Sequence, residues 1–257
     1  MQKLFITNRK NQKIALVVEG EEKIGPLAFV MHGLGGFKEQ PHIQAMVEVF
    51  LENGFIVVRF DTTNTFGESG GDYEDATTTN YYEDLEDVIS WASKEPWYKE
   101  PFFLVGHSLG GICTALYAEE YPERVAGLAP LGTVVSGELS RSVYTKEQLA
   151  EWERTGLRIT PSKSIPGLMK KLKWSHMVDR LNYNLLPNVK KLVMPILLIV
   201  GEKDESTPPS HQRILFDALL GPKELHIIKG APHTFRETKH LEELRRLVDK
   251  WIKNYAI

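Results

Sequence analysis

Short apolar runs alternate along the chain with longer segments in which apolar residues recur every three or four positions. The runs are typical of buried strands, and the recurring pattern is typical of helices that cover a sheet. Residues 43–52 show the helical pattern, with Ile43, Met46 and Phe50 on one face. Alternating strands and helices predict a mostly parallel sheet that is covered by helices on both faces.

The first two predicted strands form a hairpin across the polar turn at residues 8–11, and the rest alternate with helices. The predicted strands are Leu4–Thr7, Lys13–Val18, Pro26–Met31, Phe55–Phe60, Phe102–Val105, Val125–Ala129, Val193–Val200 and Glu224–Ile228. The predicted helices are Ile43–Glu52, Asn80–Ser93, Ile112–Glu120 and two that begin near Ser210 and Lys239.

Residues 134–192 interrupt this alternation, because they contain no strand of the kind that lies in a core. Two short helices fit the pattern there, at Lys146–Thr155 and Ile165–Leu172. We therefore expect residues 134–192 to form a helical cap, or lid, inserted between the sixth and seventh strands. Residues 1–133 and 193–257 then make up a single core domain.

The composition is that of an ordinary globular protein. The chain has 257 residues, 42% of them hydrophobic and 25% charged, and this length is sufficient for a full core. Its 31 basic and 34 acidic residues give a net charge of −3. A protein that follows a phosphate backbone usually carries a basic excess, so we expect no nucleic-acid partner.

Cellular location and redox chemistry are constrained by what the sequence lacks. Cys113 is the only cysteine, which excludes an intramolecular disulfide framework and a cysteine-based structural zinc site. Residues 1–13 have no apolar core of the kind found in signal peptides. The apolar run Leu192–Val200 is about half as long as a membrane span, and Pro195 interrupts it. We expect a cytoplasmic protein without a membrane span.

Residues 106–110, Gly-His-Ser-Leu-Gly, match the G-x-S-x-G pattern of a nucleophile elbow. A predicted strand precedes the motif and a predicted helix follows it, as the chemistry requires. The tight turn strains the backbone at Ser108 and projects its hydroxyl outward, while Gly106 and Gly110 prevent collisions across the turn. The pattern predicts that Ser108 is a nucleophile and that the N–H of Leu109 is one donor to an oxyanion.

At this point the chain resembles the α/β-hydrolase superfamily, and in particular the cinnamoyl/feruloyl esterases and the monoacylglycerol-lipase-like group. The resemblance spans nearly the whole chain. It is carried by His-Gly-Leu-Gly-Gly at 32–36, Arg-Phe-Asp at 59–61, the elbow at 106–110, Gly-Glu-Lys-Asp at 201–204 and Pro-His at 232–233. It implies an α/β-hydrolase fold with the cap described above, and it implies that the Leu34 N–H is the second oxyanion donor.

In this superfamily the catalytic residues follow the order serine, acid, histidine. Four histidines follow the acid that the resemblance implies, at positions 211, 226, 233 and 240. His233 alone lies in a loop after a strand, so we predict that it is the general base. The resemblance implies Asp204 as the acid, with Glu202 and Glu205 as rivals close in sequence. Asp61 and Asp179 are alternatives only if that loop is displaced.

These residues together predict a serine carboxylesterase that hydrolyses small to medium acyl esters, with aromatic acyl groups among the candidates. The reaction requires no metal and no cofactor. Phe37, Trp152 and Trp174 are candidates for substrate binding, although packing within the cap explains the two tryptophans equally well. Alternatives are a monoacylglycerol-type lipase, a thioesterase or an aminopeptidase-like amidase with the same residues, and a non-catalytic binding module on the same fold. The sequence leaves a monomer and a homodimer equally open.

Overall fold

The central sheet of the computed structural model has the strand order β1-β2-β4-β3-β5-β6-β9-β10. The structure describes residues 2–20, 25–162, 165 and 167–255. The strands of this sheet are β1 (Gln2–Thr7), β2 (Lys13–Glu19), β3 (Leu27–Met31), β4 (Ile56–Phe60), β5 (Phe102–His107), β6 (Val125–Leu131), β9 (Ile196–Gly201) and β10 (Lys223–Ile228). Strand β2 runs antiparallel to its neighbours β1 and β4, and the other neighbouring pairs are parallel. The prediction of a mostly parallel sheet is confirmed.

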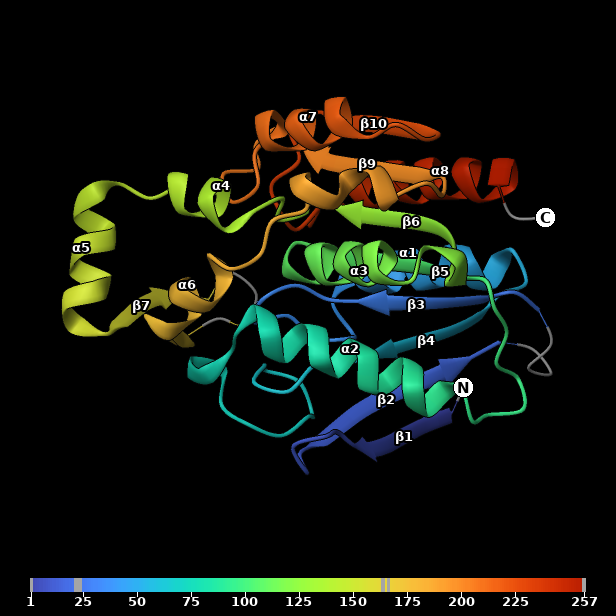
Figure 1. Cartoon of the computed structure of the whole chain (residues 1–257), viewed down its shortest axis with the longest axis horizontal. Coiled ribbons are helices and arrows are strands. Elements are labelled where there is room, and N and C mark those ends of the chain that lie inside the picture. The colour runs from blue at the N-terminus through green and yellow to red at the C-terminus, as the bar shows by residue number, and fades with distance from the viewer. Residues whose placement is uncertain (1, 21–24, 163–164, 166, 256–257) are drawn as a thin grey trace.

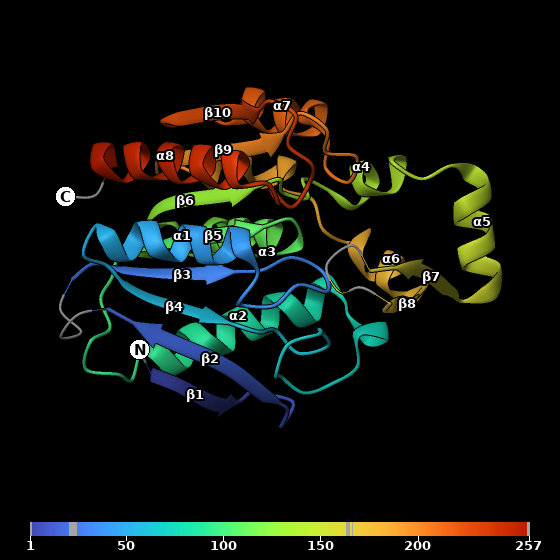
Figure 2. The same cartoon turned by 180° about the vertical axis from the view of Figure 1, so that it is seen from behind.

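Helices cover both faces of the sheet (Figures 1 and 2). Helices α1 (Pro41–Glu52) and α8 (Thr238–Tyr255) pack against each other on one face. Helices α2 (Thr78–Ala92) and α3 (Leu109–Glu120) lie side by side on the other face, where α7 (Pro209–Ala218) also contributes to the core.

The apolar runs of the sequence are explained by this two-sided cover. In β3, Leu27, Phe29 and Met31 face the core beneath α2 and α3. Ala28 and Val30 face the core beneath α1 and α8. A strand that is buried on both faces needs no polar positions, so its sequence is apolar throughout.

Between β6 and β9 the chain leaves the sheet and projects beyond it (Figure 1, left). We call residues 132–195 the insertion. Its elements are α4 (Gly137–Ser142), α5 (Lys146–Thr155), β7 (Leu157–Pro161), β8 (Met169–Lys173), α6 (Ser175–Arg180) and the 3₁₀ helix η3 (Leu186–Lys191). Shorter 3₁₀ helices, η1 (Tyr73–Asp75) and η2 (Pro122–Arg124), lie outside the insertion.

The insertion is not wholly helical, which corrects part of the prediction. The helix predicted over Lys146–Thr155 is confirmed as α5. The helix predicted over Ile165–Leu172 is wrong, because Met169–Lys173 forms a strand that pairs antiparallel with β7. Of the β8 side chains only Leu172 is buried, so this short exposed segment satisfies its backbone by pairing with β7 rather than by burying a helical face. Residues 163, 164 and 166 lie outside the described residues.

A small cluster of aromatic rings holds the insertion together. Trp152 is only 2% exposed, and its indole N–H donates a hydrogen bond to the Leu172 carbonyl at 3.0 Å. The Trp152 ring lies 5.4 Å from that of Trp174 and 5.9 Å from that of Tyr144.

Within the described part of the chain, no helix has both the length and the apolar character needed to cross a bilayer.

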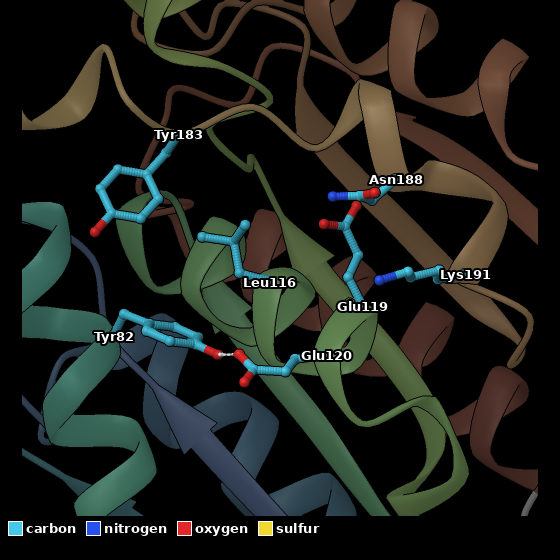
Figure 3. A pocket seen from close by; sticks show the side chains of 7 residues that line it. All are labelled: Tyr82, Leu116, Glu119, Glu120, Tyr183, Asn188 and Lys191. Atoms are coloured by element: carbon cyan, nitrogen blue, oxygen red, sulfur yellow. Dashed lines mark hydrogen bonds between the residues drawn. The ribbon is translucent and has the colours of Figure 1, made fainter.

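The carboxyl-terminal end of α3 borders a hollow of about 310 Å³ on the surface (Figure 3). Glu119 lines it with Asn188 and Lys191 nearby, and Tyr82 donates a hydrogen bond to Glu120 at 2.6 Å. Glu119 is 5% exposed, and its Oε1 has no hydrogen-bond partner among the residues that the structure describes. Burial raises the pKa of the Glu119 carboxyl to about 8, although the charge of Lys191 opposes the shift.

Candidate active site

Ser108 lies at the turn between β5 and α3, where its backbone has φ +56° and ψ −112°. This left-handed φ is strained for a residue with a side chain. The turn holds because the Ser108 N–H donates to the Leu131 carbonyl at 2.9 Å and the Ser108 carbonyl accepts from the Val134 N–H at 3.2 Å. A Cβ at Gly106 would lie 2.3 Å from the Gly110 carbonyl oxygen, so this turn requires glycine.

A chain of hydrogen bonds connects Ser108 to His233 and Asp204. Ser108 Oγ lies 2.9 Å from His233 Nε2, and His233 Nδ1 lies 2.6 Å from Asp204 Oδ2. Ser108 follows β5, Asp204 follows β9 and His233 follows β10. The carboxyl ends of parallel strands lie at one edge of a sheet, and this arrangement brings together three residues that are far apart in sequence.

The Asp204 carboxylate is buried and accepts several hydrogen bonds. Its Oδ1 accepts from the backbone N–H groups of Ser206 at 2.8 Å and Thr207 at 2.9 Å, and the Thr207 hydroxyl lies 2.9 Å from Oδ2. Burial by itself raises the pKa of the Asp204 carboxyl. The hydrogen bond and charge of His233 and the donors of Thr207 outweigh burial and lower the pKa to about 2. Asp204 is therefore ionised at neutral pH and accepts the His233 Nδ1–H.

Sequence analysis did not find the role of His107, the residue before the serine. Its Nε2 lies 2.8 Å from the His233 carbonyl oxygen, and its ring lies 4.6 Å from the His233 ring. Burial, followed by the charge of His233, lowers the pKa of His107 to about 3. His107 is thus neutral, and it donates a hydrogen bond that fixes the backbone of His233.

Residues 32–36, which we call the glycine loop, lie directly against the serine. A Cβ at Gly33 would lie 2.9 Å from the Ser108 Cβ. Leu109 is the first residue of α3, where backbone N–H groups have no acceptor within the helix. Leu34 follows Gly33 and is half-buried, as is Phe37 just beyond the loop.

The His32 ring holds the glycine loop in place through two hydrogen bonds. Its Nδ1–H donates to the Gly33 carbonyl at 2.8 Å, and its Nε2 accepts from the Thr62 N–H at 3.0 Å. Burial lowers the pKa of His32, so the ring is neutral and can hold both bonds. The loop position therefore depends on the segment that contains Thr62.

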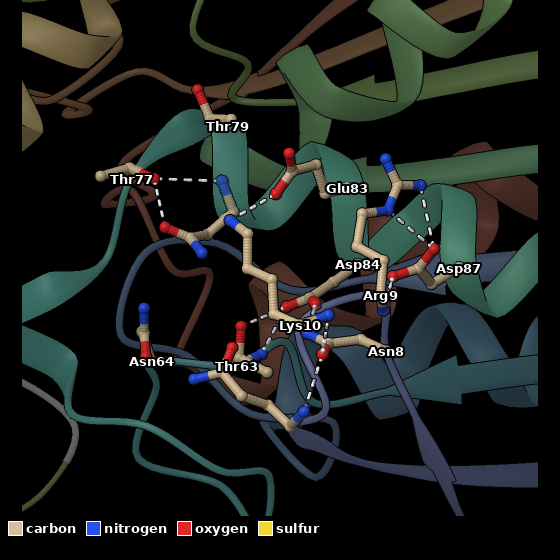
Figure 4. A network of polar contacts seen from close by, with 12 residues as sticks. Asn8, Arg9, Lys10, Thr63, Asn64, Thr77, Thr79, Glu83, Asp84 and Asp87 are labelled. Atoms are coloured by element: carbon tan, nitrogen blue, oxygen red, sulfur yellow. Dashed lines mark hydrogen bonds and ion pairs between the residues drawn. The ribbon is translucent and has the colours of Figure 1, made fainter.

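That segment is held by Asp84 of α2 (Figure 4). Asp84 Oδ2 accepts from the N–H of Thr63 at 2.6 Å and from its hydroxyl at 2.7 Å. Asp84 Oδ1 accepts from Asn8 Nδ2 at 2.8 Å, which ties in the turn between β1 and β2. The structural role of Asp84 is not visible in the sequence, because no local pattern marks a buried carboxylate whose partners lie in two distant turns.

Three of the other acids that the sequence suggested are engaged elsewhere, and Glu205 is exposed. Asp61 binds Lys38 through the backbone N–H and the Nζ, each at 2.7 Å. Asp179 accepts from the N–H groups of Thr78 at 2.7 Å and Thr79 at 3.1 Å. Glu202 accepts from the Gly230 N–H at 2.8 Å.

The two tryptophans lie together in the insertion, where their ring centroids are 5.4 Å apart. Trp152 belongs to the aromatic cluster described above. Trp174 is partly exposed and lines an open hollow of about 510 Å³ with Thr155, Leu157 and Lys173.

The sheet order and the serine at the turn after β5 define an α/β-hydrolase fold. The chain belongs to the Hydrolase_4 family, described as "Serine aminopeptidase, S33", whose model matches residues 26–181. It is therefore a member of a hydrolase family.

Individual relatives are distant. The chain is 26% identical to an uncharacterized 31.7 kDa protein of Escherichia coli, over 97% of this chain and 99% of that protein. It is 22% identical to a thermostable monoacylglycerol lipase of Bacillus sp. (strain H-257), over 81% and 83% of the two chains. The solved structure of Est1E from Butyrivibrio proteoclasticus with bound ferulic acid superposes with a TM-score of 0.81 and 22% identity, covering 98% of this chain and 99% of that chain. At this identity the last comparison shows the fold.

Proposed function

We propose that this hydrolase is a serine carboxylesterase that acts on small to medium acyl esters, aromatic acyl groups included. The observation that carries the proposal is the hydrogen-bonded chain from Ser108 through His233 to Asp204. Each member has the environment that its role requires: a strained, half-buried turn for the serine, a loop for the histidine and a buried ionised acid.

In the proposed reaction, His233 Nε2 takes the proton of Ser108 as Oγ bonds to the acyl carbon. The N–H groups of Leu34 and Leu109 donate to the oxyanion that develops on the carbonyl oxygen. When the tetrahedral intermediate collapses, the bond to the alcohol oxygen breaks and His233 returns the proton to that oxygen. Water then hydrolyses the acyl-enzyme by the same steps, with His233 as the base. Asp204 holds the tautomer of His233 and stabilises its charged form.

The bound ferulic acid in Est1E and the monoacylglycerol lipase among the relatives both support an ester substrate. We propose that residues 134–192 act as the cap over Ser108, and that Phe37 and Trp174 contribute to substrate contacts. Trp152 fits a structural role in the cap better, because it is buried and hydrogen-bonded.

The proposal is tested by hydrolysis of p-nitrophenyl esters from C2 to C12 and of methyl ferulate, with wild type beside Ser108→Ala. We expect turnover that falls by roughly 10⁴- to 10⁶-fold in Ser108→Ala. A fluorophosphonate probe should label wild type and leave Ser108→Ala unlabelled. Hydrolysis that survives in Ser108→Ala would show that the nucleophile is another residue.

The same experiment, extended to thioester and amide substrates, separates these alternatives. Wild type that is labelled but cleaves only thioesters or amides would be a thioesterase or an amidase with the same nucleophile. Wild type that is neither labelled nor active on any of the three bond types would favour a binding module.

A further inference from the structure

Arg180, the last residue of α6, is a buried cation without an acidic partner. It is 7% exposed, and within the described residues it forms no ion pair. Its Nη1 donates to the Ser140 hydroxyl at 2.8 Å, and its Nε has no hydrogen-bond partner. A guanidinium carries five N–H donors, so most of its capacity is unused.

The charge of the neighbouring acid, Asp179, acts on Arg180, but the two side chains form no ion pair among the described residues. Asp179 is engaged by the N–H groups of Thr78 and Thr79 and by the Thr79 hydroxyl, at the start of α2. Burial lowers the pKa of Arg180, but a guanidinium stays charged in proteins. Burying an unpaired charge is costly, so a cation retained in this state indicates an anion that arrives from outside the chain.

The elements beside Arg180 reach the segments that flank Ser108. Thr78, whose N–H donates to the preceding residue Asp179, has its carbonyl oxygen 3.9 Å from the Sγ of Cys113. Tyr73 belongs to η1, which packs against β8, the strand that leads into α6. A Cβ at Gly35 would lie 2.6 Å from the Tyr73 ring, so Tyr73 packs against the glycine loop. Cys113 lies one helical turn beyond Leu109 on the same face of α3.

The insertion also connects Arg180 with Ser108. Its Val134 N–H bonds to the Ser108 carbonyl, and six residues later Ser140 accepts from Arg180. Gly137, between them, packs against the Arg180 backbone, because a Cβ there would lie 2.3 Å from the Arg180 carbonyl oxygen. Arg180 thus lies against the start of the insertion, beside elements that pack on the glycine loop and on α3.

We infer that Arg180 binds a carboxylate on the acyl portion of the substrate, so that the preferred esters are monoesters of dicarboxylic acids. This inference rests on the proposed function and specifies its substrate class. In that reaction the leaving alcohol takes its proton from His233 and lies beside the His233 loop. The described contacts of Arg180 are with the insertion and none of them involves the His233 loop, so we assign its carboxylate partner to the acyl side. A planar guanidinium holds a carboxylate with two parallel hydrogen bonds.

The test compares esters that differ only at the end of the acyl chain. Monomethyl succinate, glutarate and adipate are paired with methyl butanoate, pentanoate and hexanoate, and released acid is titrated at constant pH. We expect kcat/KM for at least one monoester to exceed that of its neutral partner by about 30-fold or more, mainly through KM. In Arg180→Gln this ratio should fall to about 1, and Arg180→Lys should recover part of it.

Arg154→Gln is the matched control. Arg154 lies on α5 of the same insertion, is 72% exposed and pairs with Glu151. Its replacement should leave the ratio at the wild-type value. A general loss of folding lowers hydrolysis of both esters, whereas loss of a carboxylate site lowers the ratio. A ratio that is the same in wild type and folded Arg180→Gln would overturn the inference.

A second measurement requires no variant. Adipate and hexanoate are compared as competitive inhibitors of methyl hexanoate hydrolysis by wild type. Adipate should inhibit at least 10-fold more strongly, and added salt should reduce the difference. Equal inhibition contradicts the role of Arg180 while the neutral ester is still hydrolysed, so the proposed function stands. Absence of hydrolysis and of fluorophosphonate labelling contradicts the proposed function itself.

Discussion

Two carboxyl groups lie near the two ends of α3, and both are almost completely buried. Asp204 is 3% exposed beside the start of the helix, and Glu119 is 5% exposed at its end. Asp204 receives hydrogen bonds from His233, Ser206 and Thr207. Glu119 Oε1 receives none within the described chain. The pKa of Asp204 is lowered to about 2, and the pKa of Glu119 is raised to about 8.

The difference shows that burial does not by itself decide the charge of an acid in this protein. Removal from water raises both pKa values. Only donors fixed by the backbone and by a histidine reverse the effect at Asp204. The end of α3 near Ser108 is therefore arranged to keep a charge, while the far end keeps a neutral acid at pH 7.

The largest expected effect is the loss of activity in Asp204→Asn, compared with the same acid-to-amide change at Glu119. Asp204→Asn should reduce kcat for ester hydrolysis by about 10⁴-fold, because an amide cannot stabilise the charged His233 and disturbs its tautomer. Glu119→Gln should change kcat by less than about twofold, since a neutral acid is replaced by a neutral amide. Steady-state kinetics on one p-nitrophenyl ester measures both. Similar losses in the two variants would remove the distinction between the two ends.

A smaller effect on kcat is expected from one methyl group added beside Ser108. The Cβ of Gly33→Ala would lie 2.9 Å from the Ser108 Cβ and 3.0 Å from the His107 carbonyl oxygen. The glycine loop must shift, and displacement of one oxyanion donor should lower kcat by about 100-fold. In Gly70→Ala the new Cβ meets nothing closer than 3.5 Å, so this variant is the control. Wild-type kcat in Gly33→Ala would mean that the loop position is unimportant.

The smallest expected effect is on the stability of the folded protein and arises from Glu119, at the carboxyl-terminal end of α3. Glu119 ionises in the unfolded chain near its ordinary pKa but only near pH 8 in the folded protein. Between about pH 5 and 8 the folded state holds the extra proton, so this residue makes stability fall as pH rises, by at most about 1.4 kcal/mol per pH unit.

Glu119→Gln removes this titration. The melting temperature of wild type, measured at pH 5, 6, 7 and 8, should decline relative to that of Glu119→Gln. Parallel curves would mean that Glu119 ionises normally, for instance by pairing with Lys191. The contribution of Asp204 has the opposite sign, because its lowered pKa stabilises the fold above about pH 4 and is lost as pH falls toward 2.

Sequence patterns predicted the core well because its signals are local. The apolar run at Phe102–Val105, the glycines of the elbow and the helix after it follow one another in sequence, and the structure contains all three. The order of serine, acid and histidine also selected Asp204 and His233, which the structure places in one hydrogen-bonded chain with Ser108.

The parts that sequence could not predict depend on tertiary partners. The strand Met169–Lys173 exists because β7 pairs with it, and its own pattern suited a helix equally well. The roles of Asp84 and His107 come from groups that are distant in sequence. Arg180 has no distinguishing neighbour in the sequence, and its significance appears only when its burial and missing partner are known.

The insertion leaves and re-enters the sheet between two strands that are themselves neighbours. Leu128 of β6 pairs with Ile196 of β9, and the Gly132 N–H donates to the Ile199 carbonyl at 2.7 Å. The sheet therefore holds both ends of the insertion together, whatever its length or sequence. Longer loops between fixed ends cost little additional free energy. This junction is consequently a natural point for exchanging modules: chimeras that keep Val134 and carry a different segment in place of residues 135–192 should retain the sheet and the Ser108 turn while acquiring a new substrate preference.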